Sequence, residues 1–368
     1  MKGKYLGILL PVMAVSLTSC SQAMKYAEHL DDYVAKMTYR TGFNILQLTD
    51  IHWNNNTSSQ ESKIYLDKVF KATAERCGKI DLVELTGDQF MLANAFHVDS
   101  FINYFEAKAK EYGFKYATIW GNHDHHGLYN PNWLSEKFSK AEHSIHIDLE
   151  DDLYGRGNFI INLMDGDDVK WQIANLDSGA SFSETAVSPF RDYDYIRKDQ
   201  TDWWLREHAK VGETVPGIAY YHIPQDENLK AWNERMALTN KFFKLEEFAD
   251  NGNEKYASNF IDEASKHNLK GAFMGHAHNI DWTVEYMGVI IGLGVKTGPE
   301  LYYAHCDPKS EDPLMVEGYQ NTPEMEGIKF DLIGASLVTL KDDDTFDLAH
   351  LYLNERANED DFVMWVNW

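Results

Sequence analysis

The sequence is poor in cysteine and in basic residues. Three cysteines in 368 residues are too few for a disulfide framework. Lysine and arginine number 34 against 58 acidic residues, so the formal net charge is −24. General affinity for nucleic acid or for an anionic membrane surface needs basic patches, and this charge argues against both. An anionic substrate would have to be attracted locally, for example by bound cations.

Long apolar runs are also scarce, and the first of them lies at the N-terminus. Two lysines precede the apolar residues 5–17, a run too short to cross a bilayer as a helix. The run ends in Leu17-Thr18-Ser19-Cys20, which resembles the lipobox of bacterial lipoproteins. We therefore expect a signal peptide over residues 1–19, lipid on Cys20, and a location in the bacterial cell envelope at a membrane. A plain signal peptide that contains a cysteine is the alternative.

The remaining cysteines, Cys77 and Cys306, lie far apart in the sequence. Cys77 falls in the apolar stripe of an expected helix, which favours a buried thiol. An oxidising compartment would permit a bridge between the two, but no feature of the sequence argues for one.

What the sequence does contain is an ordinary globular composition, with 44% hydrophobic residues. Strand and helix patterns alternate over residues 43–48, 62–77, 82–85, 99–112 and 116–120, and Asp99 is the expected cap of the second helix. This alternation indicates βαβ units and a mostly parallel sheet. Hairpins are expected over residues 159–176, 283–293 and 337–353.

We predict an α/β fold in which two mixed sheets pack face to face with helices outside. A tether over residues 20–42 and a tail over residues 357–368 would flank a single domain at 43–356. One domain is preferred to two because polar motifs from both halves must share one site.

Polar motifs follow five expected strands at their carboxyl ends: the three strands of the βαβ units and two further strands over residues 216–221 and 271–274. Loops at that edge of a parallel sheet converge, and residues two apart in an extended strand face the same way. Aspartate, histidine and asparagine suit a hard or borderline divalent cation. Each motif alone is a weak signal, but their ordered occurrence at successive strand ends predicts one metal-binding cluster. The residues are Asp50, His52, Asp88, Asn122, His123, His222, His276 and His278.

The order of these motifs resembles the calcineurin-like metallophosphoesterase superfamily. The resemblance covers about residues 43–353 and implies a four-layer αββα sandwich. Leu176-Asp177-Ser178, and Tyr195 together with residues 200–203, also look similar to phosphatases related to purple acid phosphatases.

The resemblance implies two divalent metal ions. Asp50, His52 and His278 would hold one ion; Asn122, His222 and His276 would hold the other; Asp88 would bridge them. Two such ions lower the pKa of a water molecule and neutralise phosphoryl charge. Manganese, iron and zinc all remain open.

The same resemblance gives His123 the role of general acid, protonating the leaving oxygen, with Asp124 orienting it through a hydrogen bond. The implied reaction is hydrolysis of a small phosphate monoester. A phosphodiesterase or nucleotidase with the same site is the alternative within enzymes. A surface binding protein without turnover is the alternative outside them.

The chain also departs from the family pattern. Met91 stands where many members have a ligand-supporting aspartate or asparagine and where purple acid phosphatases have a tyrosine ligand. With Met91 and His52, this protein is not expected to be purple. His125 and Lys296 are weaker predictions for substrate contacts, a solvent-facing histidine and a surface lysine being the plainer interpretations. Tyr302, Tyr303 and His305 are assigned to the cleft on similar grounds.

The lipobox makes a direct prediction for Cys20→Ser. We expect the full-length chain, expressed in a bacterial host, to incorporate labelled palmitate and to partition into the detergent phase of Triton X-114. The serine variant has no thiol to receive the lipid, so it should lose the label and move to the aqueous phase. A wild-type protein without label, cleaved upstream of Cys20, would indicate the plain signal peptide instead.

Overall fold

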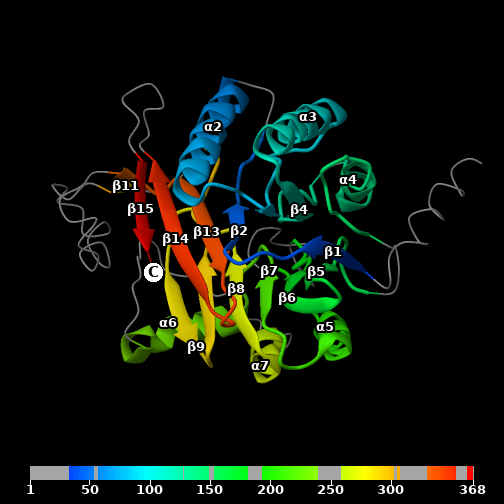
Figure 1. Ribbon diagram of the computed structural model, residues 1–368. Helices are drawn as coiled ribbons and strands as arrows, with labels where there is room; N and C mark the ends of the chain where they lie inside the picture. The colour runs from blue at the N-terminus through cyan, green and yellow to red at the C-terminus, as the bar shows by residue number, and fades with distance from the viewer. Residues whose placement is uncertain are drawn as a thin grey trace, which may run out of the picture.

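The computed structural model describes residues 33–53, 57–126, 128–148, 153–180, 193–238, 258–301, 305–306, 330–353 and 363–367. Two mixed β-sheets lie at its centre (Figure 1). The six-stranded sheet has the order β15-β14-β13-β2-β3-β4, and the seven-stranded sheet has the order β1-β5-β6-β7-β8-β10-β9. The short strands β11 (His305–Cys306) and β12 (Phe330–Asp331) pair separately.

The six-stranded sheet is built from the expected βαβ units. β2 (Phe43–Leu48), β3 (Leu82–Thr86) and β4 (Lys115–Ile119) run parallel, and α2 (Thr57–Cys77) and α3 (Ala95–Tyr112) connect them. The hairpin of β13 (Gly334–Leu340) and β14 (Phe346–Leu353) adds antiparallel strands. The expected cap at Asp99 is wrong, because the Asn94 side chain accepts the hydrogen bond from His97 N and starts α3 upstream of Asp99.

The seven-stranded sheet contains the other two predicted hairpins. β5 (Phe159–Asp165) pairs with β6 (Asp168–Asn175), and β9 (Thr283–Tyr286) pairs with β10 (Val289–Leu293), both antiparallel. Between them run the parallel strands β7 (Gly217–Tyr220) and β8 (Leu269–Met274). All three hairpin predictions are therefore confirmed.

Helices cover the outer faces of both sheets, which confirms the expected two-sheet α/β architecture. In Figure 1, α2, α3 and α4 (Pro131–Phe138) lie on one side of the sheets. On the other side lie α5 (Lys198–Val211), α6 (Asp226–Leu238) and α7 (Phe260–Ala264), the last continued by η2 (Ser265–His267). One core cluster, including Phe70 and Phe105, fills the space under α2 and α3, and a second cluster joins the two sheets.

The ends of the predicted domain need correction. Residues 34–38, expected in a tether, form β1 (Val34–Thr38), which pairs parallel with β5. Residues 363–367, expected in a tail, form β15 (Val363–Asn367), which pairs antiparallel with β14. Both segments thus complete sheet edges.

Residues 1–32 lie outside the described part of the chain, and with them the predicted signal peptide and Cys20. Among the described helices, none has both the length and the apolar character needed to cross a membrane. Cys77 is a free thiol and so does not pair with Cys306. It is half-buried rather than buried, and its Sγ donates to the carbonyl of Lys79 at 3.2 Å.

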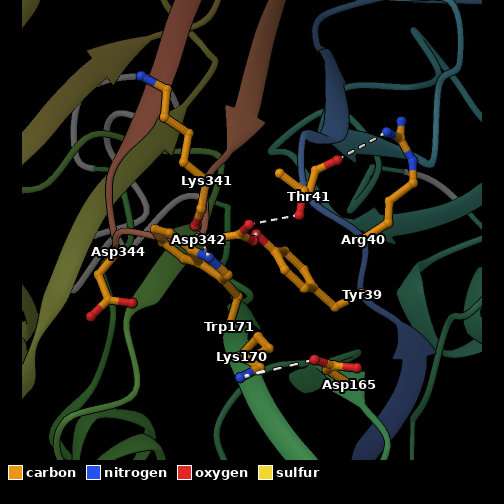
Figure 2. A pocket seen from close by; sticks show the side chains of 9 residues that line it. All are labelled: Tyr39, Arg40, Thr41, Asp165, Lys170, Trp171, Lys341, Asp342 and Asp344. Carbon is orange, nitrogen blue, oxygen red and sulfur yellow. Dashed lines mark hydrogen bonds and ion pairs between the residues drawn. The ribbon is translucent and has the colours of Figure 1, made fainter.

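A pocket of about 410 Å³ opens at the end of the sandwich where β2 and β6 begin (Figure 2). Three connections line it: the one before β2, the β5–β6 turn and the β13–β14 turn. Asp342 closes one side by accepting hydrogen bonds from the hydroxyls of Tyr39, at 2.9 Å, and Thr41, at 2.7 Å. The predicted site residues follow the opposite ends of the strands, so this pocket is separate from them.

Glu84 is an unusual residue for the space between the sheets. It lies on β3 and is fully buried, in register with Gln47 of β2. Burial raises the pKa of its carboxyl group well above the ordinary value of 4.5, and the nearby Asn175 amide offsets only part of this effect. The folded chain therefore favours the neutral acid at this position.

Glu84→Gln tests the effect of that carboxyl group on stability. The pKa of the Glu84 carboxyl group is raised in the folded state. Its contribution to the free energy of unfolding is therefore fully present at pH values below its ordinary pKa, and it is lost as the pH rises through the folded-state pKa. Glutamine does not ionise, so the variant should gain in free energy of unfolding relative to wild type as the pH rises from about 5 to about 9. Urea titrations at several pH values measure this difference. A difference that does not change with pH would contradict the prediction.

Candidate metal centre

The candidate centre is formed where the loops after β2, β3 and β8 meet. Asp50 N donates to Gly87 O at 3.0 Å and His52 N donates to Asp88 O at 2.9 Å, so the first two loops run side by side. Asp50, His52, Asp88 and His276 have φ angles of 53°, 50°, 53° and 74°. This left-handed conformation is uncommon for residues other than glycine and is concentrated at functional sites.

Two glycines allow the loops to approach this closely. A Cβ atom at Gly121 would lie 2.2 Å from Asp88 Oδ1, and one at Gly87 would lie 2.3 Å from His222 Nδ1. Gly87 also has a φ of 96°. Any side chain at either position would push an acidic or imidazole group out of the cluster.

One half of the cluster contains Asp50, His52 and His278. Asp50 Oδ1 lies 3.2 Å from His278 Nε2 and 3.9 Å from His52 Nε2, and the two histidine nitrogens are 3.1 Å apart. Together with Asp88, these residues offer four ligand atoms within 4.8 Å of one another. All four side chains are buried, so the atoms converge on one small, dry volume.

The other half contains Asn122, His222 and His276. Asn122 Oδ1 lies 3.2 Å from His222 Nε2 and 2.8 Å from His276 Nδ1. Asp88 stands between the halves, with Oδ2 3.4 Å from His222 Nε2 and 3.8 Å from His52 Nε2. The structure therefore brings all seven predicted ligand residues together in two groups that share one carboxylate.

The electrostatics of the cluster favour positive charge. Burial acts to raise the pKa of Asp50 and Asp88, but it is outweighed. The hydrogen bond from His278 and the charge of His222 hold the pKa of Asp50 well below its usual range, and His222 does the same for Asp88. Burial likewise opposes charge on His222, yet Asp88 raises the pKa of His222 to about 9. At neutral pH, a proton on His222 thus balances part of the buried negative charge.

The other imidazoles are suited to bind a cation. Burial lowers the pKa of His276 to about 3 and that of His52 well below its usual value. Both are therefore neutral at about pH 7, which is the protonation state of a histidine ligand. Oxygen and imidazole donors, two carboxylates and no thiolate fit a divalent cation such as manganese, iron or zinc.

Neighbouring polar groups fix the orientation of these side chains. His222 Nδ1 lies 2.8 Å from the carbonyl oxygen of Thr86, which leaves Nε2 directed at the cluster. Thr49 Oγ1 donates to Asp50 Oδ2 at 2.7 Å. Such contacts orient the metal-binding side chains before any cation is bound, so less free energy is spent on ordering them when a cation binds.

His123 lies at the more open side of the cluster. Its backbone N donates to Asp88 Oδ1 at 2.8 Å, and its ring packs edge-on against His52 with centroids 5.0 Å apart. The residue is partly exposed, unlike the buried His52. Its position is compatible with contact to a molecule entering from solvent.

The predicted hydrogen bond between Asp124 and His123 is wrong. The Asp124 carboxylate instead accepts from the backbone N–H groups of Gly121, Gln89 and Phe90, at 2.9, 3.3 and 3.0 Å. Burial, reinforced by the charge of Asp88, raises the pKa of Asp124 to about 7. Asp124 therefore ties the loop after β4 to the loop after β3 and sets the position of His123 through the backbone.

The expectation of a surface lysine at 296 is also wrong. Lys296 is 2% exposed, and its Nζ donates to the carbonyl oxygen of Asp50 at 2.7 Å. Burial lowers the pKa of this ammonium group to about 8. Lys296 supports the backbone beneath Asp50, and its predicted contact with substrate stays a prediction.

His125 is not solvent-facing either. Its side chain is 23% exposed, and Nε2 lies 3.5 Å from Oδ1 of the buried Asp177. Burial opposes charge on this imidazole, but Asp177 raises its pKa overall. Its predicted contact with substrate stays a prediction. Tyr302, Tyr303 and the side chain of His305 lie outside the described residues.

Sequence reasoning missed Tyr193. Its ring packs edge-on against His276, with centroids 4.3 Å apart and an interplanar angle of 79°. The available signal was its position two residues before Tyr195, in a stretch already singled out by its resemblance to phosphatases. Nothing in the local pattern indicated that this stretch returns to the loop after β8.

Comparison with protein families agrees with this geometry, since a family profile described as "Calcineurin-like phosphoesterase" matches residues 43–279. "Probable inactive purple acid phosphatase 29" of Arabidopsis thaliana is 24% identical over 295 residues, covering 71% of this chain and 73% of that protein. "Phosphatase DCR2" of Saccharomyces cerevisiae is 28% identical over 207 residues, covering 51% and 35%. A solved 5'-nucleotidase precursor from Thermus thermophilus aligns with a TM-score of 0.42 at 12% identity, covering 87% of this chain and 56% of that one.

The cluster predicts that divalent cations stabilise the fold and that Asp88→Asn abolishes the effect. A cation bound only by the folded chain, at one hundred times its Kd, adds about 2.7 kcal/mol to the free energy of unfolding. We expect manganese or zinc to raise the wild-type melting temperature by several degrees. The asparagine variant, lacking the shared carboxylate, should respond little.

Asp342→Asn, in the distant pocket, is the matched control and should respond as wild type does. Differential scanning calorimetry with metal analysis of the dialysed proteins provides the measurement. An equal response of Asp88→Asn and wild type would show that the cations bind elsewhere.

Proposed function

The chain belongs to the calcineurin-like phosphoesterase family, and on that premise we propose that it hydrolyses phosphate monoesters at a dinuclear metal centre. The observation that carries the proposal is the pair of ligand groups on either side of Asp88. Asp88 Oδ2 lies 3.4 Å from His222 Nε2 and 3.8 Å from His52 Nε2, so one carboxylate faces both halves. That arrangement suits two cations sharing a bridging ligand.

In this proposal each half of the cluster holds one divalent cation. Asp50, His52 and His278 would hold the first; Asn122, His222 and His276 would hold the second; and Asp88 would serve both. Bound cations of this kind supply a nucleophile at neutral pH by lowering the pKa of water, and they offset the charge of the phosphoryl group. The metal identity stays open among manganese, iron and zinc.

The chain's own contribution is to position and to donate a proton. His123 is a partly exposed imidazole that is not assigned as a metal ligand, and we assign it the proton that the leaving oxygen receives. Its backbone hydrogen bond to Asp88 Oδ1 fixes its place relative to the bridging ligand. Asp124 holds the loop that carries His123 by accepting three backbone hydrogen bonds. The buried carboxylates and imidazoles keep bulk water out of the centre.

The proposed preference for monoesters is supported by the plant and yeast relatives, both of which carry phosphatase names. The word "inactive" in the name of the Arabidopsis relative describes that plant protein and not this chain. In this chain, the complete set of seven ligand side chains and His123 supports turnover. A diesterase or nucleotidase reaction at the same centre is the alternative, and a comparison of 4-nitrophenyl phosphate with bis(4-nitrophenyl) phosphate distinguishes them.

The lipobox supports a proposed place for the enzyme. Lipid on Cys20 would hold the catalytic domain at a membrane of the bacterial cell envelope, where small phosphorylated molecules are its substrates. The net charge of −24 disfavours binding to anionic lipid surfaces, so the anchor rather than the domain would supply the membrane contact.

His123→Ala tests the assigned general acid. An alkoxide leaves poorly without a proton, whereas 4-nitrophenolate needs little help. We expect kcat for an alkyl phosphate to fall at least about 100-fold, while kcat for 4-nitrophenyl phosphate falls less than about tenfold. Metal content should be unchanged, because His123 is not assigned as a ligand.

His97→Ala, a histidine change on α3, is the control and should leave both rates unaltered. Steady-state kinetics with both substrates, together with metal analysis, gives the answer. Loss of metal from His123→Ala would refute the assigned role, and equal losses of rate on both substrates would refute proton donation. A metal-loaded wild type that hydrolyses neither ester would refute the proposed function itself.

A further inference from the structure

Tyr193 is an aromatic residue beside the metal cluster that has no role in the proposed metal binding or proton transfer. It lies outside the ordered motifs, yet its ring contacts His276 edge-on, with centroids 4.3 Å apart. On another side, the His276 ring packs against His222, with centroids 5.2 Å apart. Tyr193 is only partly buried. It therefore borders the half of the cluster that contains Asn122, on a side with access to solvent.

The residues immediately after Tyr193 hold it firmly in this position. Asp194 is buried, and its carboxylate accepts from Arg197 at 2.7 Å and from the hydroxyl of Tyr154. The Arg197 guanidinium lies over the rings of Tyr154 and Tyr195, 4.5 and 3.9 Å from their centroids. An ion pair whose carboxylate is buried and whose guanidinium contacts two aromatic rings is a rigid arrangement.

A second set of hydrogen bonds anchors the same segment to the sheet. Gln200 is fully buried; its Oε1 accepts from Arg197 N at 2.7 Å, and its Nε2 donates to Asp177 O at 2.7 Å. Ile196 N donates to Gln225 Oε1 at 2.9 Å. These buried bonds are expensive to break, so the position of Tyr193 over His276 is fixed before any ligand binds.

The phenol group of Tyr193 belongs to the ring that contacts His276, and an ordinary phenol, with a pKa of about 10, is neutral at about pH 7. A neutral phenol there is a hydrogen-bond donor next to a place where phosphoryl oxygens would gather.

We propose that Tyr193 is a substrate-binding residue, and that its hydroxyl donates a hydrogen bond to a phosphoryl oxygen held at the His276 side of the centre. The inference rests on the proposed function for the identity of the ligand as a phosphate group. It adds a recognition element that the metal motifs do not contain. The segment at Asp194, Arg197 and Gln200 then serves to position this donor.

Tyr193→Phe provides the test, because phenylalanine keeps the ring against His276 and removes only the hydroxyl. The probe is inorganic phosphate, titrated by calorimetry into the metal-loaded full-length protein. A hydrogen bond to a charged group is lost, so we expect Kd for phosphate to rise at least about tenfold. Metal content should equal that of wild type, and KM for 4-nitrophenyl phosphate should rise more than kcat falls.

Tyr104→Phe is the matched control. The hydroxyl of Tyr104 donates to Asp67 at 2.8 Å on the helical face of the six-stranded sheet, so its loss should not change phosphate binding. Arg197→Lys is a second variant. It keeps the charge beside Asp194 but gives up the planar stacking on two rings, and it should weaken phosphate binding in the same direction as Tyr193→Phe.

The outcomes separate this inference from the proposed function. Unchanged phosphate affinity in Tyr193→Phe overturns the inference, while hydrolysis by wild type leaves the proposed function standing. Loss of metal from Tyr193→Phe also overturns it, because the hydroxyl would then serve the centre itself. Tyrosine-dependent phosphate binding without hydrolysis supports the inference and contradicts the function. A wild type that neither binds phosphate nor hydrolyses esters overturns both.

Discussion

The structure depends on two carboxylates, Asp50 and Asp88, that are buried within one cluster and must be balanced by positive charge. Both are 1% exposed, and each faces imidazole nitrogens rather than water. Buried charges of one sign are costly unless they are paired or coordinate a cation. Without a cation, a proton on His222 supplies part of the balance. The strained backbone at Asp50, His52, Asp88 and His276 is a further cost that the surrounding sheets must support.

The two-sheet architecture supplies that support. Three parallel strands of one sheet and two of the other end at the same edge, and each delivers a short polar loop to it. Backbone hydrogen bonds between loops, such as that from Gly275 N to His222 O at 3.1 Å, lock the loops to one another. The edge strands β1 and β15, formed by segments expected to lie outside the domain, complete the sheets far from the centre. Rigid sheets and short loops together place ligand atoms with the precision that metal binding requires.

The proposed function and the inference on Tyr193 use different parts of this arrangement. The ligand groups come from strand ends that the sequence marks with ordered motifs. Tyr193 comes from the described segment just before α5, where Asp194 pairs with Arg197 and the buried Gln200 of α5 donates a hydrogen bond to Asn158. In the proposed function, metal coordination would account for reactivity, and the hydroxyl of Tyr193 would account for part of the binding of the phosphate group. In a site of this kind, residue changes in the segment that carries Tyr193 can alter substrate preference without altering the metal-binding residues.

Much of the fold was predictable from the sequence, because hydrophobic periodicity and turn residues act locally. Such patterns predict the three hairpins, the two mixed sheets and the parallel strands β2, β3, β4, β7 and β8. They also predict the convergence of Asp50, Asp88, Asn122 and His276 at one edge. Side-chain partners were not predictable in the same way. Asp124 and His123 are sequence neighbours, yet the Asp124 carboxylate turns to backbone N–H groups of a different loop.

The burial of a residue and its contacts depend on residues distant in the sequence. Tertiary packing therefore buries Lys296, brings Tyr193 to His276, and adds β1 and β15 to the edges of the two sheets. Lys296 follows a hairpin and has no local signal for burial, and Tyr193 reaches His276 only because the buried segment after it is anchored to the sheet. The order of residues along the chain is enough to place carboxylates, imidazoles and an amide at the strand ends. Which of these groups face one another depends on how the two sheets and their loops pack, so it can be seen only in the folded protein.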